Sequence, residues 1–272
     1  MTAHALNQAG LAFDTLAANY DTHFTTSHIG RAQRNVVWQK TREVFRTPSH
    51  ILELNCGTGE DALFLASQGH SVTALDASHA MIDRASHRKQ LEAPTADIHF
   101  QPLPSEYLSA LPVKPFDAVF SNFSGLNCVP DLHRVSQQLA LRTPPGAPVL
   151  LCLSTRICLW ESVWFLLQGK LHKAIRRWSG ESTAALNGVH VTVYYPTVAT
   201  VTKAFKPGFH LRSTTGVGIV VPPSYLEPWM RHCPRLLAWM TRIDRLLCRL
   251  PLFRTLGDHV LLHLERTQEA AA

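Results

Sequence analysis

Ile51-Leu52-Glu53-Leu54-Asn55-Cys56-Gly57-Thr58-Gly59-Glu60-Asp61 is the stretch that decides which fold the sequence predicts. An apolar run that contains one acid leads into a turn with two glycines, and two more acids begin the next segment. A second apolar run, residues 71–75, ends in Asp76. A strand, a glycine-rich turn, a helix and a second strand that ends in an acid are typical of a nucleoside-binding βαβ unit.

The charges around this turn indicate which ligand the unit suits. Gly57 and Gly59 let the backbone approach a ligand closely, and dinucleotide folds use such a turn to hold a pyrophosphate at a helix N-terminus. Glu53 and residues 60–61 would repel that group. They favour a cationic ligand without phosphate, such as S-adenosylmethionine, with Asp76 accepting from the ribose hydroxyls. The alternative is an ordinary βαβ turn with solvated acids at the start of a helix, where the macrodipole favours them.

Four segments carry a resemblance to a known family, and together they span residues 13–154. They are Phe13-Asp14-Thr15-Leu16-Ala17-Ala18-Asn19-Tyr20-Asp21, Glu53-Leu54-Asn55-Cys56-Gly57-Thr58-Gly59, Leu75-Asp76-Ala77-Ser78 with Met81, and Phe116-Asp117-Ala118-Val119-Phe120-Ser121-Asn122-Phe123. In these segments the chain resembles the class I S-adenosylmethionine-dependent methyltransferases of small-molecule type. It departs from them after the third strand, where Phe100-Gln101-Pro102-Leu103-Pro104 lacks the acid that many members place near the adenine amino group.

The resemblance implies S-adenosyl-L-methionine as cofactor and in-line transfer of its methyl group to a small molecule. Glu53 would then help hold the methionine end, Gly57 and Gly59 would admit the cofactor, and Asp76 would bind the ribose. The predicted cofactor-binding residues are Tyr20, Glu53, Asn55, Gly57, Gly59, Asp76, Ala77, Met81 and Asn122. Tyr20 and Met81 are equally explained as apolar positions of amphipathic helices. No catalytic side chain is assigned; His190, Tyr194, Tyr195 and Tyr225 are candidate bases without a preference among them.

Hydrophobic periodicity predicts an α/β fold with a doubly wound, seven-stranded, mostly parallel sheet, N-terminal helices and an inserted helical lid. Two helices are expected over residues 9–46. Strands are expected at 50–54, 71–75, 97–101, 116–121, 148–153, 189–195, 210–221 and 259–265, with helices at 60–68, 79–90, 131–142, 159–178, 197–205 and 235–249. Residues 179–188 are expected to be a polar connection. The predicted units are 1–154 with the cofactor-binding half, 155–208 as lid, and 209–272 with the last strands and a basic helix between them.

Cysteine usage and the N-terminus predict a cytoplasmic protein without a metal site. Six cysteines occur without C-x-x-C spacing, and no histidine pair accompanies them at zinc-finger spacing. Buried reduced thiols are therefore expected, which favours a reducing compartment. The first ten residues lack a basic start followed by an apolar run, so no secretion signal is predicted.

The net charge of +6 is unevenly distributed along the 272 residues. Residues 1–155 carry 11 Lys or Arg and 13 Asp or Glu, whereas residues 156–254 carry 14 and 4. Arg242, Arg245 and Arg249 lie three and four residues apart, on one face of an amphipathic helix. Such a helix suits an anionic membrane surface, and the alternative is a solvated face of a helix packed on the domain. Because no reading module accompanies the charge, nucleic acid is not expected as a partner; the sequence does not determine the oligomeric state.

Two other functions remain open at this point. A nicotinamide-dependent oxidoreductase would use the same βαβ unit, but the acids around the turn disfavour it. A binding protein that keeps the fold without turnover is the second, since methyl transfer needs no unique catalytic side chain. The later half is rich in Trp, Leu and Phe as well as basic residues, so we expect a small amphiphilic or anionic acceptor.

Overall fold

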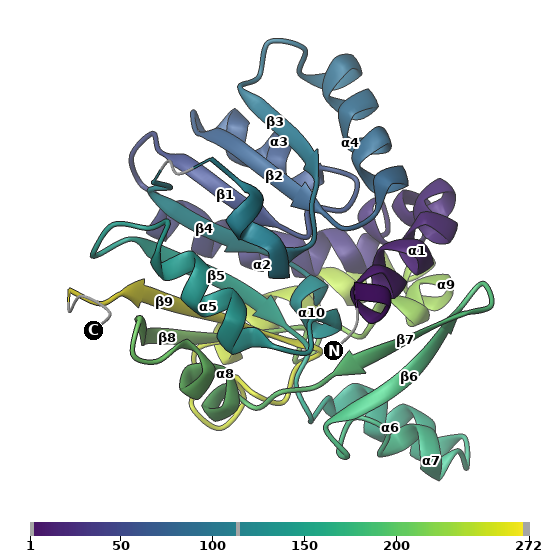
Figure 1. Ribbon diagram of the computed structural model, residues 1–272. Helices are drawn as coiled ribbons and strands as arrows, with labels where there is room; N and C mark the ends of the chain where they lie inside the picture. The colour runs from purple at the N-terminus through teal and green to yellow at the C-terminus, as the bar shows by residue number, and fades with distance from the viewer. Residues whose placement is uncertain (1–2, 113–114, 269–272) are drawn as a thin grey trace.

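A seven-stranded sheet in the order β3-β2-β1-β4-β5-β9-β8 forms the centre of the computed structural model, which describes residues 3–112 and 115–268 (Figure 1). Strands β1 to β5 run parallel, and β9 is antiparallel to both of its neighbours, β5 and β8. The predicted doubly wound, mostly parallel sheet is confirmed. Its strands are β1 (His50–Leu54), β2 (Ser71–Asp76), β3 (Ile98–Pro102), β4 (Ala118–Ser121), β5 (Pro148–Leu153), β8 (Phe209–Val217) and β9 (His259–Arg266).

Helices cover both faces of the sheet, which is why its strands read as nearly continuous apolar runs. Side chains alternate between the faces along each strand. On β1, Leu52 and Leu54 belong to the core that includes α5 (Leu132–Ala140) and α8 (Val198–Phe205). Ile51 belongs to the core on the opposite face, whose helices are α2 (His28–Val44), α3 (Glu60–Ser67) and α4 (His79–Glu92).

The strand order reverses between β1 and β4, and this reversal places the ligand crevice. Strands β2 and β3 follow on one side of β1, while β4 and β5 lie on the other. In open α/β sheets a ligand binds beside such a switch point, at the carboxyl ends of the strands. Asp76 ends β2, Glu53 is the penultimate residue of β1, and Asn122 follows β4 directly.

The N-terminal helix α1 (Ala3–Tyr20) docks on the start of α4. Asp14 of α1 accepts hydrogen bonds from the Ser78 hydroxyl at 2.6 Å and from the Ala80 backbone N–H at 2.9 Å. Gly10 crosses Ala77 so closely that a Cβ atom would lie 2.5 Å from its carbonyl oxygen. One π-helical turn, Asp21–Thr25, then joins α1 to α2. The two predicted N-terminal helices are therefore present, and the first lies over the carboxyl edge of the sheet.

Residues 179–188, predicted to be a polar connection, instead contain strand β6 (Glu181–Leu186). It pairs with β7 (Val189–Tyr194) in a hairpin separate from the main sheet. Asn187 and Gly188 form its two-residue loop, with φ angles of 46° and 86°. Both residues are left-handed, which the twist of a tight hairpin requires and which Asn-Gly tolerates. The prediction of a connection without a strand was wrong, because the residues of β6 are mostly small and give only a weak alternation of apolar and polar positions.

This hairpin is tied to the body of the molecule at both of its ends. At the tip, the Asn187 amide donates to the Thr15 carbonyl oxygen of α1 at 3.0 Å. At the base, the buried Asn127 amide donates to the carbonyl oxygens of Tyr194 at 2.5 Å and Ser154 at 2.8 Å. Figure 1 shows the hairpin extending from the core toward α1. Together, α1 and the hairpin enclose the space over the strand ends.

The remaining helices frame the later half of the chain. The helix predicted over residues 159–178 is interrupted at Gly169 and forms α6 (Leu159–Leu167) and α7 (Leu171–Ala174). Helices α9 (Glu227–Met230) and α10 (Pro234–Leu247) lie against α2 through a third core cluster. Strand β8 ends four residues before the predicted Val221. Its continuation turns away because the carboxylate of buried Asp244 accepts from the backbone N–H groups of residues 218–220.

Candidate active site

The carboxyl ends of β1, β2 and β4 open into a cavity of about 930 Å³, including the part that opens to solvent. Phe13 from α1 and Val193 from β7 also line it. Other residues that line it are Gly10, Arg34, Thr58, Glu60, Asp61, Phe123, Ser124, Gly125 and Cys128.

Most of the sequence-predicted cofactor residues meet in this cavity. Those that line it are Tyr20, Asn55, Gly57, Asp76, Ala77, Met81 and Asn122. Glu53 and Gly59 do not line it. Both belong to the stretch 53–59, on which the prediction of a cofactor site mainly depended.

Gly57 presents backbone alone to the cavity, and Asp76 holds it there. Its φ of +53° is left-handed, and a Cβ atom at this position would point into open space beside Tyr20 Cε1 at 3.9 Å. The Gly57 N–H donates to Asp76 Oδ2 at 2.8 Å, and the Ser78 N–H donates to Asp76 Oδ1 at 2.9 Å. Each carboxylate oxygen accepts several hydrogen bonds when ionised. Asp76 therefore keeps acceptor capacity for a ligand.

Gly59 has a different role from the predicted one. A Cβ atom there would lie 2.9 Å from both the Ala85 methyl of α4 and the Phe100 ring of β3. Its φ of +79° also strains any other residue. The second glycine of the motif thus lets α3 begin against its neighbours and does not admit a ligand.

The two acids that begin α3 are paired with arginines, which corrects the predicted electrostatics. Asp61 is buried in an ion pair with Arg34 of α2 and accepts from the Trp38 indole N–H at 2.6 Å. Glu60 forms an ion pair with Arg88 of α4. From the sequence, both acids were expected to leave uncompensated negative charge at the turn. Their arginine partners come from other helices and neutralise much of that charge.

Glu53 and Asp76 are two carboxyls of this region that no described basic side chain pairs with. Glu53 is 1% exposed, and its Oε2 has no hydrogen-bond partner among the described residues. Burial, with Asp61 and Asp76 nearby, raises the pKa of Glu53 well above its usual range. Burial also raises the pKa of Asp76 to about 6. Both shifts show that the ionised forms are costly in the free protein, so a cationic or hydroxyl-bearing ligand is favoured beside them.

A strained turn after β4 places Asn122, Phe123 and Ser124 at the wall of the cavity. Phe123 and Ser124 have φ angles of 45° and 66°, a conformation that costs energy for residues other than glycine. Asn122, just before them, donates from its amide to Asp61 Oδ2 at 3.1 Å. The sequence predicted this exit loop at the site, and here Asn122 links it to the ion pair of Asp61.

Sequence reasoning missed the residues that attach α1 and α2 to the site. Asp21 accepts from the Thr58 hydroxyl at 2.6 Å and pairs with Arg88 at 2.7 Å. Asp14 and Asp21 are seven residues apart, two helical turns, which was a visible signal for one binding face. Arg34 had no such signal, because its partner Asp61 is 27 residues away in sequence.

Comparison with known proteins agrees with this geometry. Residues 51–146 match the model of a family described as "Methyltransferase domain". This part of the chain, about a third of its length, is therefore similar to methyltransferase domains. The methyltransferase match begins with β1 and contains the glycine turn, Asp76 and the exit loop after β4. A search of curated protein sequences found no match to this chain.

Solved structures share the fold over nearly their whole length at low sequence identity. An S-adenosylmethionine-dependent methyltransferase from Mesorhizobium loti has a TM-score of 0.59 at 20% identity, covering 86% of this chain and 98% of its own. DhpI, solved as a complex with SAH, has 0.60 at 17%, covering 98% and 100%. The [4+2]-cyclase SpnF has 0.65 at 14%, covering 96% and 97%. Because SpnF is a cyclase, the fold alone does not fix the reaction.

The residues of the cavity fit S-adenosylmethionine. Asp76 keeps acceptor capacity and Gly57 leaves bare backbone at the wall, while Glu53, close to the cavity lining in sequence but outside it, has a buried carboxyl oxygen without a partner among the described residues. No phosphate-binding cation is needed, since the arginines nearest the turn are taken by Asp61 and Glu60. Within the described residues, no group of three or more His, Cys, Asp or Glu is arranged to hold a metal ion. No described helix is long and apolar enough to cross a membrane.

Proposed function

We propose that the chain transfers the methyl group of S-adenosylmethionine to a small amphiphilic or anionic metabolite by in-line displacement. The observation that carries this proposal is the buried carboxyl of Glu53 and the half-buried carboxyl of Asp76, at adjoining strand ends beside the bare backbone of Gly57. The bound cofactor would supply the electrophilic methyl group. The chain would supply alignment and the exclusion of water, which account for much of the acceleration in such a transfer.

The proposed roles follow from position in the cavity. Asp76 would accept from the ribose hydroxyls, and Glu53 would balance the positive methionine end from behind Asn55. Ala77, Met81 and Cys128 offer apolar surface for adenine. Tyr20 would lie over the cofactor from the end of α1; burial raises the pKa of its hydroxyl to about 12, so it stays protonated. The segment 100–104 offers no acid for the adenine amino group.

Binding measurements separate this function from its alternatives. In calorimetric titration, the protein should bind S-adenosylmethionine and the demethylated product and should not bind a nicotinamide dinucleotide. Labelled methyl groups should then appear in a compound of a metabolite extract. Preferential binding of the dinucleotide would replace the proposal with an oxidoreductase. Cofactor binding without any labelled product would favour a non-catalytic binding protein.

We also propose a peripheral contact with an anionic membrane surface. Exposed apolar side chains gather on the helices of the later half, close to basic ones. They are Leu159, Val163, Leu166, Leu167, Leu171, Ile175, Trp178, Trp229, Leu236, Trp239, Leu246 and Leu250. Helices α6 and α9 adjoin through the Trp164 and Trp229 rings, whose centroids are 5.6 Å apart. Amphipathic surfaces with Trp, Leu and Lys or Arg bind at the headgroup boundary.

Vesicle flotation tests this contact. The protein should float with vesicles that contain phosphatidylserine, should float less with phosphatidylcholine alone, and should be released by salt. Trp239→Ser and Leu246→Ser should weaken flotation, whereas Leu91→Ser, an exposed leucine on α4, serves as the matched control. Equal flotation with both vesicle types, or none with either, would remove the proposal.

A further inference from the structure

A second cavity adjoins the first and is not used by the proposed cofactor site. It measures about 800 Å³, including its open part, and shares Tyr20 and Phe123 with the first cavity. Ser154 of the second cavity lies 2.8 Å, hydroxyl to hydroxyl, from Ser124 of the first. The two cavities therefore meet at the strained turn after β4. A molecule in the second would approach the cofactor site across the Phe123 ring.

Much of the lining of this second cavity is aromatic. Tyr20, Phe24, Phe123 and Tyr225 contribute rings, and Pro223 adds an apolar surface. The Phe24 and Phe123 rings meet edge to face at 4.8 Å. Walls of this kind favour a flat, largely apolar guest, because aromatic pairs gain from stacked and edge-to-face arrangements.

The lining also contains a cluster of ion pairs. Arg177 joins the lid to the core, since its Nη2 donates to Glu161 Oε2 at 2.7 Å and to Asp258 Oδ1 at 2.8 Å. Arg176 donates to the two oxygens of Glu161 from Nε at 2.5 Å and from Nη2 at 3.0 Å. Its side chain is 40% exposed, and its Nη1 makes no hydrogen bond to another described residue. Arg176 thus has a nitrogen left for an anionic group on the guest.

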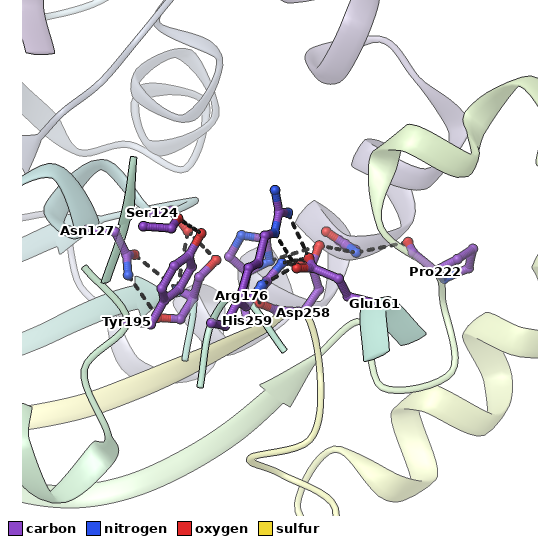
Figure 2. Close-up of polar contacts among 12 residues, drawn as sticks. Ser124, Asn127, Glu161, Arg176, Tyr195, Pro222, Asp258 and His259 are labelled. Atoms are coloured by element: carbon purple, nitrogen blue, oxygen red, sulfur yellow. Dashed lines mark hydrogen bonds and ion pairs between the residues drawn. The ribbon is translucent and has the colours of Figure 1, made fainter. Parts of the chain in front are cut away.

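His259, the first residue of β9, also lines this cavity, and Figure 2 shows it beside Asp258 and Arg176. Its ring meets Phe123 edge to face at 5.3 Å. Its Nδ1 is buried without a hydrogen bond among the described residues, 3.5 Å from Asp258 Oδ2. Burial lowers the pKa of His259, so the ring is neutral at pH 7. Despite burial, which opposes it, His259 and Arg177 hold the pKa of Asp258 below its usual range.

We propose that the second cavity binds the methyl acceptor, an aromatic hydroxyl compound that carries a carboxylate, and that His259 takes the hydroxyl proton. The acceptor oxygen forms the new O–CH₃ bond with its own electron pair, the sulfur–methyl bond breaks, and sulfur keeps that pair as a neutral thioether. The O–H proton passes to the imidazole, and the resulting imidazolium faces the Asp258 carboxylate. Arg176 pairs with the acceptor's carboxylate. This inference rests on the proposed methyltransferase function.

The first test uses three hydroxybenzoates, with the hydroxyl ortho, meta or para to the carboxylate, as probe acceptors. Protein that binds S-adenosylmethionine in calorimetry should transfer labelled methyl to the hydroxyl oxygen of at least one of them. Transfer to none, with cofactor binding intact, overturns the acceptor proposal and leaves the proposed function standing. Failure of the wild-type protein to bind the cofactor overturns the proposed function, and this inference with it.

The second test addresses His259 directly. His259→Gln should lower kcat by about 100-fold or more, as expected for loss of a general base, with cofactor affinity unchanged. His263→Gln, four residues further along β9, is the matched control. Wild-type rates should fall in acid and level off above the pKa of His259, whereas rates of the variant should keep rising with pH. An unchanged rate and pH profile in His259→Gln would overturn the assignment of His259 as the base. The charged and titratable groups around the ring are Asp258, Arg177, Arg176, Glu161, Tyr20 and Tyr225.

A third variant keeps the proposal testable if His259→Gln does not fold. Arg176→Gln changes a side chain that is partly exposed and leaves Glu161 paired with Arg177. It should raise KM about tenfold for the hydroxybenzoate that is methylated, as is typical of losing a charge-assisted hydrogen bond. For para-cresol, a phenol without a carboxylate, KM should stay unchanged. Equal changes for both acceptors would overturn the assignment of Arg176 to the carboxylate.

Discussion

The cofactor cavity, lined mostly by the first half of the chain, and the second cavity, to which the later half also contributes, are built in different ways. In the first, residues close in sequence determine the site: Gly57 and Asp76 stand at either end of one βαβ unit. In the second, the ion pairs join distant segments, since Arg177 and Asp258 are 81 residues apart. On the proposed function, the cofactor would be recognised by local geometry and the acceptor by long-range packing. Substitutions in the first half should affect cofactor binding, and those in the second should affect turnover.

The largest expected effect in the cofactor half comes from Asp76→Ala. The variant loses the acceptor proposed for the ribose hydroxyls and the anchor of the Gly57 N–H. Cofactor affinity should fall by about 2–3 kcal/mol, or roughly 30- to 150-fold, as is typical of charge-assisted hydrogen bonds. Calorimetry measures this, with Asp83→Ala on the exposed side of α4 as control. Unchanged affinity in a folded Asp76→Ala protein would refute the role of Asp76.

The next largest effect should come from displacing α1, which leaves the side chains at the strand ends unchanged. In Gly10→Val, the new side chain would collide with the Ala77 carbonyl oxygen and displace α1. Cofactor affinity should fall by about 1–2 kcal/mol, a common size for a steric substitution, and proteolysis of α1 should accelerate. Ala18→Val, exposed on the same helix, controls for the lower helix propensity of valine. Wild-type affinity in Gly10→Val would mean that α1 does not close the site.

Sequence predicted the cofactor half well because its signals are local. Glycines, apolar runs and the acid at the end of β2 lie within one βαβ unit, and the strand ends followed from the topology. The charges were not predictable in this way, since Asp61 is compensated by Arg34 and Glu60 by Arg88. The hairpin was predictable in principle, because Asn187-Gly188 is a strong two-residue hairpin signal. His259 was not, because neither Phe123 nor Arg177 lies near it in sequence.

Glu53→Gln tests whether the buried carboxyl was kept for a ligand. Because burial raises the pKa of Glu53, the folded protein holds a proton that the unfolded chain releases above its ordinary pKa of about 4.3. Wild-type stability should therefore fall by about 1.4 kcal/mol for each pH unit between those two pKa values. Denaturant unfolding of the free protein should show Glu53→Gln gaining stability relative to wild type as pH rises above the ordinary glutamate pKa.

The same variant should bind S-adenosylmethionine more weakly, because the amide cannot balance a positive charge. Higher stability together with lower affinity would identify Glu53 as a functional group that the fold tolerates at a cost. A stability difference that does not change with pH would show that the carboxyl is not protonated by folding. Unchanged affinity would remove Glu53 from the cofactor site.

The smallest expected effect concerns the hairpin, where the two halves of the molecule meet. Asn187→Gly removes the hydrogen bond to the Thr15 carbonyl oxygen and keeps a residue that adopts the positive φ of the turn. Loss of one such bond should cost about 0.5–1.5 kcal/mol, seen as faster hydrogen exchange in β6, β7 and the end of α1. Asn187→Ala should cost more, because alanine also strains the turn. If both variants exchange at the wild-type rate, the hairpin is held by Asn127 at its base, and α1 closes the cofactor cavity without it.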